Sequence, residues 1–476
     1  MENEQTSNYG ATIAPIKNLR KHSNADRLMV GDVQGFPVIV GLETKEGDLG
    51  ILIREGSQLS KEFALANNLF SSHPDTGEKL SGYLSDNARV KALKLRGEKS
   101  EGLFLPLTEV IIPKACGASK LPHEACSLFD EIGKHKFVWK YETPAQIRAK
   151  QAPKAQSKSY ANFQKHYSTP QLRDNVSRLA SMVAPKFIYT EKVHGTSGRT
   201  ARVPIPVPVP IKLSLLQKLW NSTIGRFAFA IPTFYEELKI QKISGTRHCV
   251  LDPEANGEKG MGYRQTCHDL ISEFIEPGFS VYYEIVGFTE HGSSIMGAHP
   301  VDKLKDSLGK KEAKEFFAEY GKTPQIYSYG CDPDGYIPGD ENESSAKKPR
   351  FRIFVYRMTR YLDSDKKPKE LTWSEIEQRI KSWGCKHIEV VPVLARNIGL
   401  HPKSEEEILD NANLLTRGPS TLDRSHIREG ICIRAEHIVG DQTVVAESVK
   451  HKGFVFCTLE GIRANDPTFI DLEAVS

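Results

Sequence analysis

The stretch Phe187-Ile188-Tyr189-Thr190-Glu191-Lys192-Val193-His194-Gly195-Thr196-Ser197 decides the fold. Its first half is apolar and β-prone, and Glu191-Lys192 leads into a glycine turn, so it predicts a strand that ends at a loop. A lysine delivered into such a loop suits a nucleophile, because the neutral amine attacks phosphorus. The ordinary pKa of lysine is about 10.4, so burial or neighbouring cations must lower it. Lys-x-His-Gly alone also fits an ordinary strand and turn, and the rest of the chain must decide.

Length and composition indicate a globular protein with two or three domains. The chain has 476 residues, of which 39% are hydrophobic and 26% are charged. The net charge of +4 permits a nucleic-acid partner without requiring one. No apolar run is long enough to span a membrane, and the polar N-terminus lacks the core of a signal peptide. The eight cysteines form no CxxC pair, which favours free thiols in a reducing, cytoplasmic setting. The lack of a spanning segment leads us to expect no membrane partner.

Residues 11–112 are expected to form a small all-β barrel of the OB type. Leu28–Val33 and Phe36–Leu42 read as strands on either side of the turn Gln34-Gly35. Further short strands separated by glycine turns follow, up to Leu103-Phe104-Leu105. Short strands at this spacing are typical of OB folds, which bind nucleic acids.

Residues 113–165 are expected to be a basic linker. From Lys134 to His166 there are eight Lys or Arg residues against one acid, Glu142, with aromatic residues between them. One interpretation is a solvated linker. The other is a basic strip that contacts phosphates and offers rings for stacking on bases.

Residues 166–460 are expected to form an α+β domain. Thr372-Trp373-Ser374-Glu375 is a capping box that precedes apolar residues at helical spacing, and Ser404–Glu407 opens a second helix in the same way. His387–Leu394 reads as a buried strand between them. Val203–Ile211 alternates Val or Ile with Pro, which favours polyproline II or a sheet edge over a central strand. No function follows from that segment.

Four further segments carry candidate site residues, each with an ordinary structural alternative. Glu284 lies in an apolar strand, where it requires a partner such as a sugar hydroxyl, a hydrated metal or a salt bridge. Phe354 and Tyr356 share one face of another strand and could stack on a purine or pack in the core. Lys450 and Lys452 also share a face, which favours an anion between them or a solvated edge. Glu429 precedes a glycine at a strand mouth, and Arg247 ends the turn Ser244-Gly245-Thr246-Arg247.

The order of these segments resembles the motif series of covalent nucleotidyltransferases, the superfamily of polynucleotide ligases and mRNA-capping enzymes. Lys-x-His-Gly-Thr is similar to the RNA ligase 2 branch, because DNA ligases and capping enzymes usually carry Asp at the position of His194. The N-terminal segments Ala25-Asp26-Arg27 and Lys94-Leu95-Arg96-Gly97 are similar to ATP-dependent RNA ligases with an N-terminal OB-like module. The resemblance covers residues 11–112 and 166–456. It implies an ATP-grasp-like, two-sheet nucleotidyltransferase domain after the barrel.

The resemblance also implies roles for the candidate residues. Lys192 would attack the α-phosphorus of ATP, while Lys450 and Lys452 would hold that phosphate and depress the pKa of Lys192. Mg²⁺ or Mn²⁺ would lie among phosphate oxygens and waters, with Glu429 and Glu284 contacting the metal through water. The resemblance implies that Glu191 accepts from the adenine amine and that Glu284 contacts the ribose. Tyr356, with Phe354 in reserve, would stack on the adenine ring. Ribose and phosphates would be contacted by the motif residues His194, Gly195, Thr196 and Ser197 and by Arg247.

The implied activity is ATP-dependent ligation of RNA. AMP would pass from Lys192 to an RNA 5′-phosphate, and a 3′-hydroxyl would then seal the strand. The expected substrate is an RNA end or a nicked duplex whose 3′-hydroxyl strand is RNA, and the expected state is a monomer. Two alternatives remain: a capping-type guanylyltransferase, and an RNA-binding protein whose nucleotidyltransferase domain has decayed.

Overall fold

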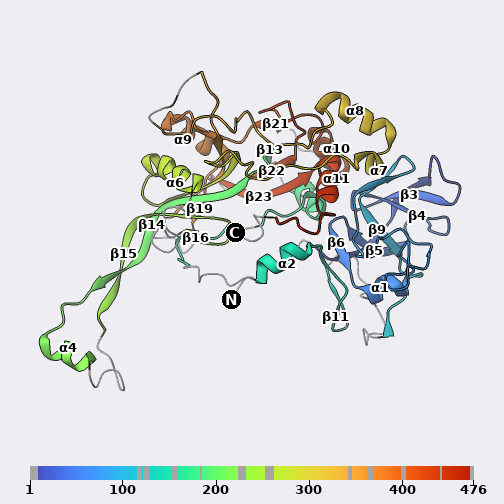
Figure 1. Cartoon of the computed structure of the whole chain (residues 1–476), viewed down its shortest axis with the longest axis horizontal. Helices are drawn as coiled ribbons and strands as arrows, with labels where there is room; N and C mark the ends of the chain where they lie inside the picture. Colours follow the sequence, from blue (N-terminus) through green and yellow to red (C-terminus); the bar gives the residue numbers. More distant parts are fainter. Residues whose placement is uncertain are drawn as a thin grey trace.

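The computed structural model shows a β-rich N-terminal part joined to a larger mixed α/β part, from which a long hairpin projects (Figure 1). The sequence prediction of an α+β protein with several sheets is confirmed at this level. The structure describes the following residues: 9–114, 121, 128–151, 159–166, 168–182, 185–222, 232–251, 262–340, 343, 346–361, 368–397, 404–439 and 442–471.

The N-terminal part contains two three-stranded antiparallel sheets. One has the order β1-β5-β9 and the other β2-β3-β4. Among the described residues the pairings leave both sheets open, so a closed OB barrel remains a prediction. The elements are β1 (Ala11–Pro15), β2 (Lys17–Lys21), β3 (Leu28–Val33), β4 (Phe36–Gly41), β5 (Leu49–Arg54), β6 (Ser57–Leu59), α1 (Lys61–Ala66), β7 (Leu93–Leu95), β8 (Glu98–Ser100) and β9 (Gly102–Pro106).

The segment predicted as a basic linker is in part built into this N-terminal part. Its elements are β10 (Glu131–Ile132), β11 (His135–Lys136), β12 (Val138–Lys140) and α2 (Pro144–Gln151). Strand β12 pairs with β6, and Phe137 and Val138 are buried in the N-terminal core. The apolar residues within the basic run therefore override the linker prediction for residues 131–140. Residues 152–158 lie outside the described chain.

Two sheets form the larger part. One sheet has the order β21-β13-β22-β23, and the other β16-β15-β14-β17-β18-β19 with β20 beside β18. The main core lies around β17 and β18, and a second core covers the outer face of β13 and β22. The strands are β13 (Lys186–Lys192), β14 (Thr196–Pro210), β15 (Phe234–Gly245), β16 (Val250–Leu251), β17 (Phe279–Gly287), β18 (Phe351–Arg360), β19 (Lys369–Glu370), β20 (Ile388–Val390), β21 (Val393–Asn397), β22 (Gly430–Val439) and β23 (Gln442–Lys452).

Two helices of the larger part begin where the sequence signals predicted. Thr372 caps α9 in a complete capping box with Glu375, and Ser404 caps α10. The Val-Pro segment forms the outer half of β14, at a sheet edge. The helices are α3 (Val176–Ala180), α4 (Leu215–Ser222), α6 (Tyr263–Phe274), α7 (Leu304–Leu308), α8 (Lys310–Tyr320), α9 (Trp373–Trp383), α10 (Glu405–Leu415) and α11 (Phe454–Arg463), with a short 3₁₀ turn at Leu172–Asp174.

A buried ion pair joins the two parts. Arg173 donates to Glu101 at 2.7 Å, and both side chains are more than nine-tenths buried. The Arg173 guanidinium also lies 4.2 Å from the centre of the Phe36 ring. Beside this pair, Arg54 bonds Asp174 at 2.5 Å. These desolvated ion pairs thus hold the N-terminal part against the larger α/β part.

Replacing Glu101 with alanine is expected to lower the free energy of unfolding by about 3–5 kcal/mol, because Arg173 would remain buried without its carboxylate. Urea unfolding measures this loss. The double variant Glu101→Leu with Arg173→Met should lose less than the single variant, since neither charge remains. Equal losses in the two variants would show that the ion pair does not determine this contact.

Candidate nucleotide-binding site

Three adjacent strands bring Lys192, Gly430 and Lys452 into one row. Lys192 pairs with Gly430 across β13 and β22, and Gly430 pairs with Lys452 across β22 and β23. Residues paired across strands point to the same face of a sheet, so both lysines flank the glycine on one side. Gly430 is required here, because an added Cβ would lie 2.2 Å from the carbonyl oxygen of His451. Lys450, two residues before Lys452, shares that face.

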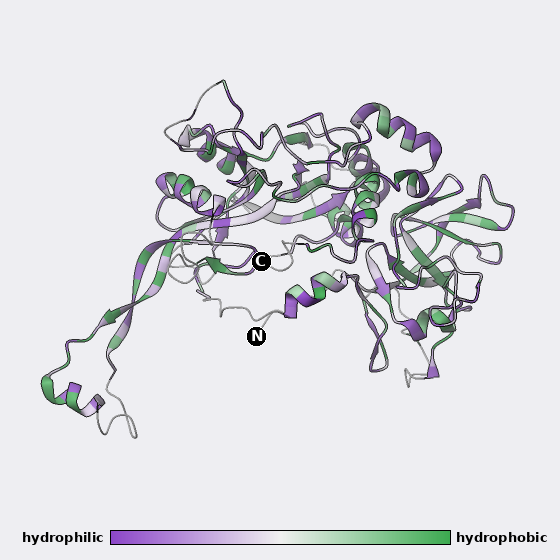
Figure 2. Ribbon diagram, viewed as in Figure 1, coloured by the Kyte–Doolittle hydropathy of each residue, from purple (hydrophilic) through white to green (hydrophobic). Residues whose placement is uncertain are grey.

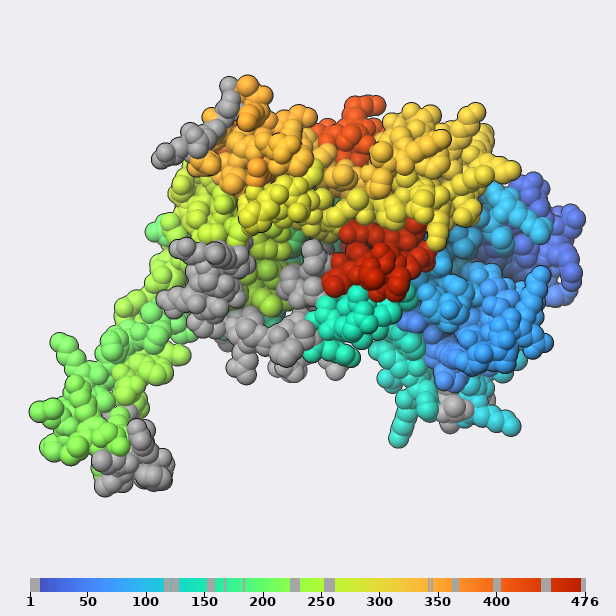
Figure 3. All heavy atoms as spheres, viewed as in Figure 1, coloured from blue at the N-terminus to red at the C-terminus, as the bar shows by residue number. Residues whose placement is uncertain are grey.

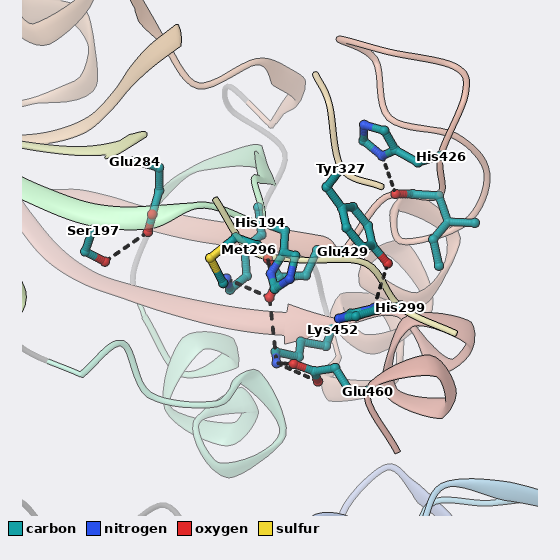
Figure 4. A network of polar contacts seen from close by, with 12 residues as sticks. His194, Ser197, Glu284, Met296, His299, Tyr327, His426, Glu429, Lys452 and Glu460 are labelled. Carbon is teal, nitrogen blue, oxygen red and sulfur yellow. Dashed lines mark hydrogen bonds and ion pairs between the residues drawn. The ribbon is translucent and has the colours of Figure 1, made fainter. Parts of the chain in front are cut away.

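Glu429 is the anion of this cluster. Its carboxylate is 2% exposed, and Oε1 lies 2.8 Å from Nζ of Lys192 and 3.7 Å from Nζ of Lys452 (Figure 4). Burial opposes the carboxylate, but Lys192 and then His194 and Lys452 hold the pKa of Glu429 well below its usual range. The buried carboxylate is therefore ionised at any pH at which the protein would act.

The pKa of Lys192 lies above its ordinary value, which corrects the sequence expectation. Burial lowers this pKa, but the Glu429 carboxylate raises it by more than Lys452 lowers it. The sequence prediction considered only the cationic neighbours of Lys192. It did not include the ion pair with Glu429, which the register of the strands creates. In this state Lys192 is protonated at neutral pH, and it can attack only after Glu429 is drawn away or neutralised.

The pKa of Lys450 is lowered in the way that was expected for the pKa of Lys192. Burial is the largest cause, and the charges of Lys192, Lys452 and Arg247 add to it, so the pKa of Lys450 falls to about 8. The charge of Arg247 thus acts on the lysine cluster, while its contact with ribose or phosphate stays a prediction. Lys452 differs: burial lowers its pKa, but the carboxylates of Glu460 and Glu429 together raise that pKa well above the ordinary value. Concentrated positive charge at this face suits an anion such as a polyphosphate.

A second row of candidates crosses the neighbouring sheet. Ser197 pairs with Glu284 across β14 and β17, and Glu284 pairs with Phe354 across β17 and β18. Oγ of Ser197 donates to Oε1 of Glu284 at 3.1 Å (Figure 4). Gly195 leads into this row, and an added Cβ there would lie 2.5 Å from the carbonyl oxygen of Ile285. The glycine of Lys-x-His-Gly thus permits β14 to approach β17 closely.

The two aromatic candidates occupy different settings. Phe354 is fully buried in the main core. Tyr356 lies where β17 and β18 change register between Tyr282 and Tyr283, so it has no residue opposite it on β17. It is half-buried, with its ring 5.6 Å from that of His166. A bulge of this kind redirects a side chain, which keeps Tyr356 the better candidate for stacking.

His194 and Glu191 flank the lysine in different ways. The His194 imidazole lies 3.6 Å from Oε2 of Glu429 and contacts the rings of His299, Tyr327 and Phe456. Glu191 is almost fully buried, and its Oε2 accepts from the backbone and hydroxyl of Thr421 at 2.9 and 2.6 Å. Its Oε1 accepts no hydrogen bond from the described residues. Glu191 therefore keeps a buried acceptor for a ligand donor.

Sequence reasoning missed three residues that hold the site. Arg264 on α6 donates to the Thr196 hydroxyl at 2.6 Å and to the Ser197 carbonyl at 3.1 Å. Glu460 on α11 accepts from Lys452 at 2.7 Å through both oxygens. The Tyr329 hydroxyl accepts from the His194 backbone at 2.6 Å. None of the three carries a sequence motif: Arg264 and Tyr329 come from distant segments, and Glu460 lies on the helix that follows Lys452.

The comparisons with solved structures identify the fold. A Naegleria gruberi RNA ligase mutant with AMP and Mn superposes with a TM-score of 0.54 at 14% identity, covering 95% of this chain and 99% of that one. This chain shares the fold of Naegleria gruberi RNA ligase. A mutant of that ligase with ATP and Mn gives 0.54 at 14% identity over 95% and 99% of the chains, and the ligase with PPi gives 0.53 at 15% over 93% and 96%.

The other comparisons add no relative. No protein-family model and no curated protein matches the chain. Within the described part of the chain, every helix is too short or too polar to cross a bilayer. The likeness to Naegleria gruberi RNA ligase therefore shows the fold of this chain.

Proposed function

We propose that the protein is an ATP-dependent RNA ligase that works through a lysyl–AMP intermediate. One observation carries the proposal: Lys192 lies on one sheet face with Lys450 and Lys452, and the buried Glu429 bonds it directly. This arrangement offers a nucleophile, a polyphosphate-binding charge and a carboxylate in a fold shared with Naegleria gruberi RNA ligase.

In the first step, Nζ of Lys192 attacks the α-phosphorus of ATP. A phosphorus–nitrogen bond forms, the α–β phosphoanhydride bond breaks, pyrophosphate leaves, and the amine proton passes to solvent. Lys450 and Lys452 neutralise charge on the phosphate oxygens as it develops. Glu460 holds Lys452 in position, since both of its oxygens bond Nζ. Because Lys192 is charged in the unliganded site, its deprotonation must accompany nucleotide and metal binding.

The donors present fit a hard divalent cation. Glu429 and Glu284 provide carboxylate oxygens, the ligand class that Mg²⁺ and Mn²⁺ prefer, and the substrate phosphates and waters would complete the shell. Bound there, the metal would neutralise phosphate charge and compete with Lys192 for the Glu429 carboxylate, which lowers the pKa of Lys192. The protein itself contributes the positions of these carboxylates and the buried setting of Glu429.

The second and third steps transfer AMP to RNA and seal it. An RNA 5′-phosphate oxygen attacks the phosphorus of lysyl–AMP, which releases Lys192. The RNA 3′-hydroxyl then attacks the activated 5′-phosphate and AMP leaves. The N-terminal module would hold RNA by its backbone and shape, as OB-type folds do, so we expect ligation to weaken as salt rises. The proposed substrate is an end or nick whose 3′-hydroxyl strand is RNA.

Glu191 is proposed to accept a hydrogen bond from the adenine amine through Oε1. Wild-type protein should then form lysyl–AMP from ATP faster than the corresponding adduct from inosine triphosphate, which lacks that amine. Glu191→Ala should reduce this preference about 10-fold or more, because the buried acceptor that discriminates between the bases is gone. The ratio of the two kcat/KM values measures it. An unchanged ratio would remove Glu191 from base recognition.

A nucleotide panel tests the proposal against both alternatives. The protein is incubated with α-labelled ATP or GTP and Mg²⁺ or Mn²⁺, and then with nicked duplexes whose 3′-hydroxyl strand is RNA or DNA. Labelling by ATP and sealing of the RNA nick are expected. Labelling by GTP alone would indicate a capping-type guanylyltransferase. Failure of labelling with every nucleotide and metal would indicate an RNA-binding protein with a decayed nucleotidyltransferase domain.

A further inference from the structure

The outer halves of β14 and β15 form an arm that extends from the body and carries α4 at its tip (Figures 1 and 3). Strand β14 pairs with β17 only up to Ala201, whereas its pairing with β15 continues to Pro210. On β15, every residue from Phe234 to Lys242 is exposed. The nucleotide site uses none of the arm beyond Ala201, so the Val-Pro segment calls for another explanation.

The proline positions close one edge of the arm. The Ile211 backbone N–H donates to the Thr233 carbonyl at 2.9 Å, which fixes the parity of the ladder. Odd-numbered residues of β14 therefore bond β15, and even-numbered ones turn their backbone groups outward. The Pro204 carbonyl fits this parity, since it accepts from Asn162 at 2.9 Å. The even positions 204, 206, 208 and 210 are all proline, so this edge has no N–H donors there and cannot accept another strand.

The outer edge of β15 keeps the backbone N–H groups that the proline edge of β14 lacks. By the same register, the even-numbered residues of β15 point their N–H and C=O groups away from β14. These residues are Phe234, Glu236, Leu238 and Ile240. Within the described chain β16 is the other neighbour of β15, and it reaches only Ser244 and Gly245. The arm thus offers a strand edge with both donors and acceptors, which is a template for pairing.

The charges of β15 are self-complementary about Leu238. In an antiparallel pair of two β15 strands centred on Leu238, Glu237 of each copy lies opposite Lys239 of the other. Glu236 lies opposite Ile240 in the same register, and Leu238 lies opposite itself. Opposite charges facing each other across strands stabilise a pair, and this arrangement supplies two such contacts by symmetry. Within one copy, the side chains of Glu237 and Lys239 are about half exposed, and Oε2 of Glu237 lies 3.1 Å from Nζ of Lys239.

The arm also exposes many large apolar side chains to solvent. In Figure 2 the hydrophobic residues are prominent along α4 and the adjoining hairpin. Eight large apolar side chains there are 40% to 85% exposed: Leu215, Leu216, Leu219, Trp220, Phe234, Tyr235, Leu238 and Ile240. Together they expose roughly 900 Å², comparable to the area that each partner buries in a standard interface. Exposed apolar side chains gathered on one projecting element are typical of an interaction site.

We propose that the arm is a dimerisation device, in which β15 pairs antiparallel with β15 of a second copy of this chain about a two-fold axis at Leu238. The four-stranded sheet that results has the order β14-β15-β15-β14. Its two outer edges are the proline edges, so the assembly closes at two copies instead of growing into a fibre. This inference is independent of the proposed ligase activity, and it replaces the expectation of a monomer.

Charge exchange at the symmetric contact tests the pairing. Glu237→Lys places Lys opposite Lys in its homodimer, and Lys239→Glu places Glu opposite Glu. Each variant alone should dimerise about 10-fold or more weakly than wild type by sedimentation equilibrium. An equimolar mixture should recover dimers, because each charge then faces its opposite in the heterodimer. A loss without recovery in the mixture would overturn the proposed register.

Leu238→Pro tests the open edge itself. The Leu238 N–H points away from β14, so proline there leaves the β14–β15 ladder intact and removes intermolecular bonds at the axis. This variant should be monomeric with unchanged labelling by ATP. As a matched control, Leu238→Ala keeps the N–H and should remain more dimeric than Leu238→Pro. Wild-type protein that is monomeric at its highest soluble concentration would overturn the proposal. So would a monomer that sediments with anionic vesicles, since the arm would then be a lipid-binding tip.

Discussion

Lys192→Ala should abolish transfer of AMP from ATP to the protein. The loss should exceed about 1,000-fold, because no other group stands in for a deleted covalent nucleophile. Gel autoradiography after incubation with α-³²P-ATP and Mn²⁺ measures it. Lys186→Ala is the matched control, since Lys186 begins the same strand, is exposed and lies at the end of β13 away from the site. It should label like wild type.

The Lys192→Ala protein should otherwise behave as a folded ligase scaffold. The variant should still unfold cooperatively in thermal denaturation, because the buried Glu429 carboxylate keeps His194 and Lys452 as partners. When it is given RNA that already carries a 5′-adenylyl group, the variant should still seal a nick, since that step bypasses the lysine. An Lys192→Ala protein that still becomes labelled by ATP would remove this residue from its role.

Glu429→Gln should slow formation of lysyl–AMP at least about 100-fold at neutral pH, because the amide is a poor ligand for a hard cation and the metal position is lost. It should also change how the remaining rate depends on pH. In the wild type the carboxylate raises the pKa of Lys192, so the rate should climb as pH rises and the ammonium loses its proton. Removing the negative charge lowers that pKa, so the residual rate of Glu429→Gln should reach its plateau at lower pH.

Single-turnover labelling across pH distinguishes the two roles of Glu429. A loss of rate with an unshifted pH profile would mean that Glu429 serves the metal but does not set the protonation of Lys192. Glu447→Gln provides a comparison, because it changes a carboxylate on β23 that pairs with Arg178 and lies away from the lysine cluster. That variant should retain both the rate and the pH profile of wild type.

Motif order singled out segments whose candidate residues the structure brings together. Lys192, Glu429 and Lys452 come from segments far apart in sequence, and the structure brings them within 4 Å contacts on one sheet face. Local patterns succeeded because strand alternation and the two helix caps are short-range features. The protonation of Lys192 could not be predicted in this way. It depends on which carboxylate lies nearest to Nζ, and that follows from register between β13, β22 and β23.

The remaining misses have the same long-range origin. Arg264 acts from α6, and nothing in its neighbourhood marks it as a partner of Thr196. Strand β12 belongs to the N-terminal core because Val138 finds β6 across the fold, which composition could not indicate. The proline alternation did predict an edge. Which backbone edge the prolines close could not be predicted, because it depends on the hydrogen bond from Ile211 to Thr233.

The most direct measurement is peptide mass spectrometry of the wild-type protein after exposure to ATP and Mg²⁺ or Mn²⁺. The peptide that contains Lys192 should gain the mass of one adenylyl group through an acid-labile bond, and added pyrophosphate should remove it. Adduct on a different side chain, or none on any peptide under either metal, would contradict the proposal that this lysine carries the nucleotide.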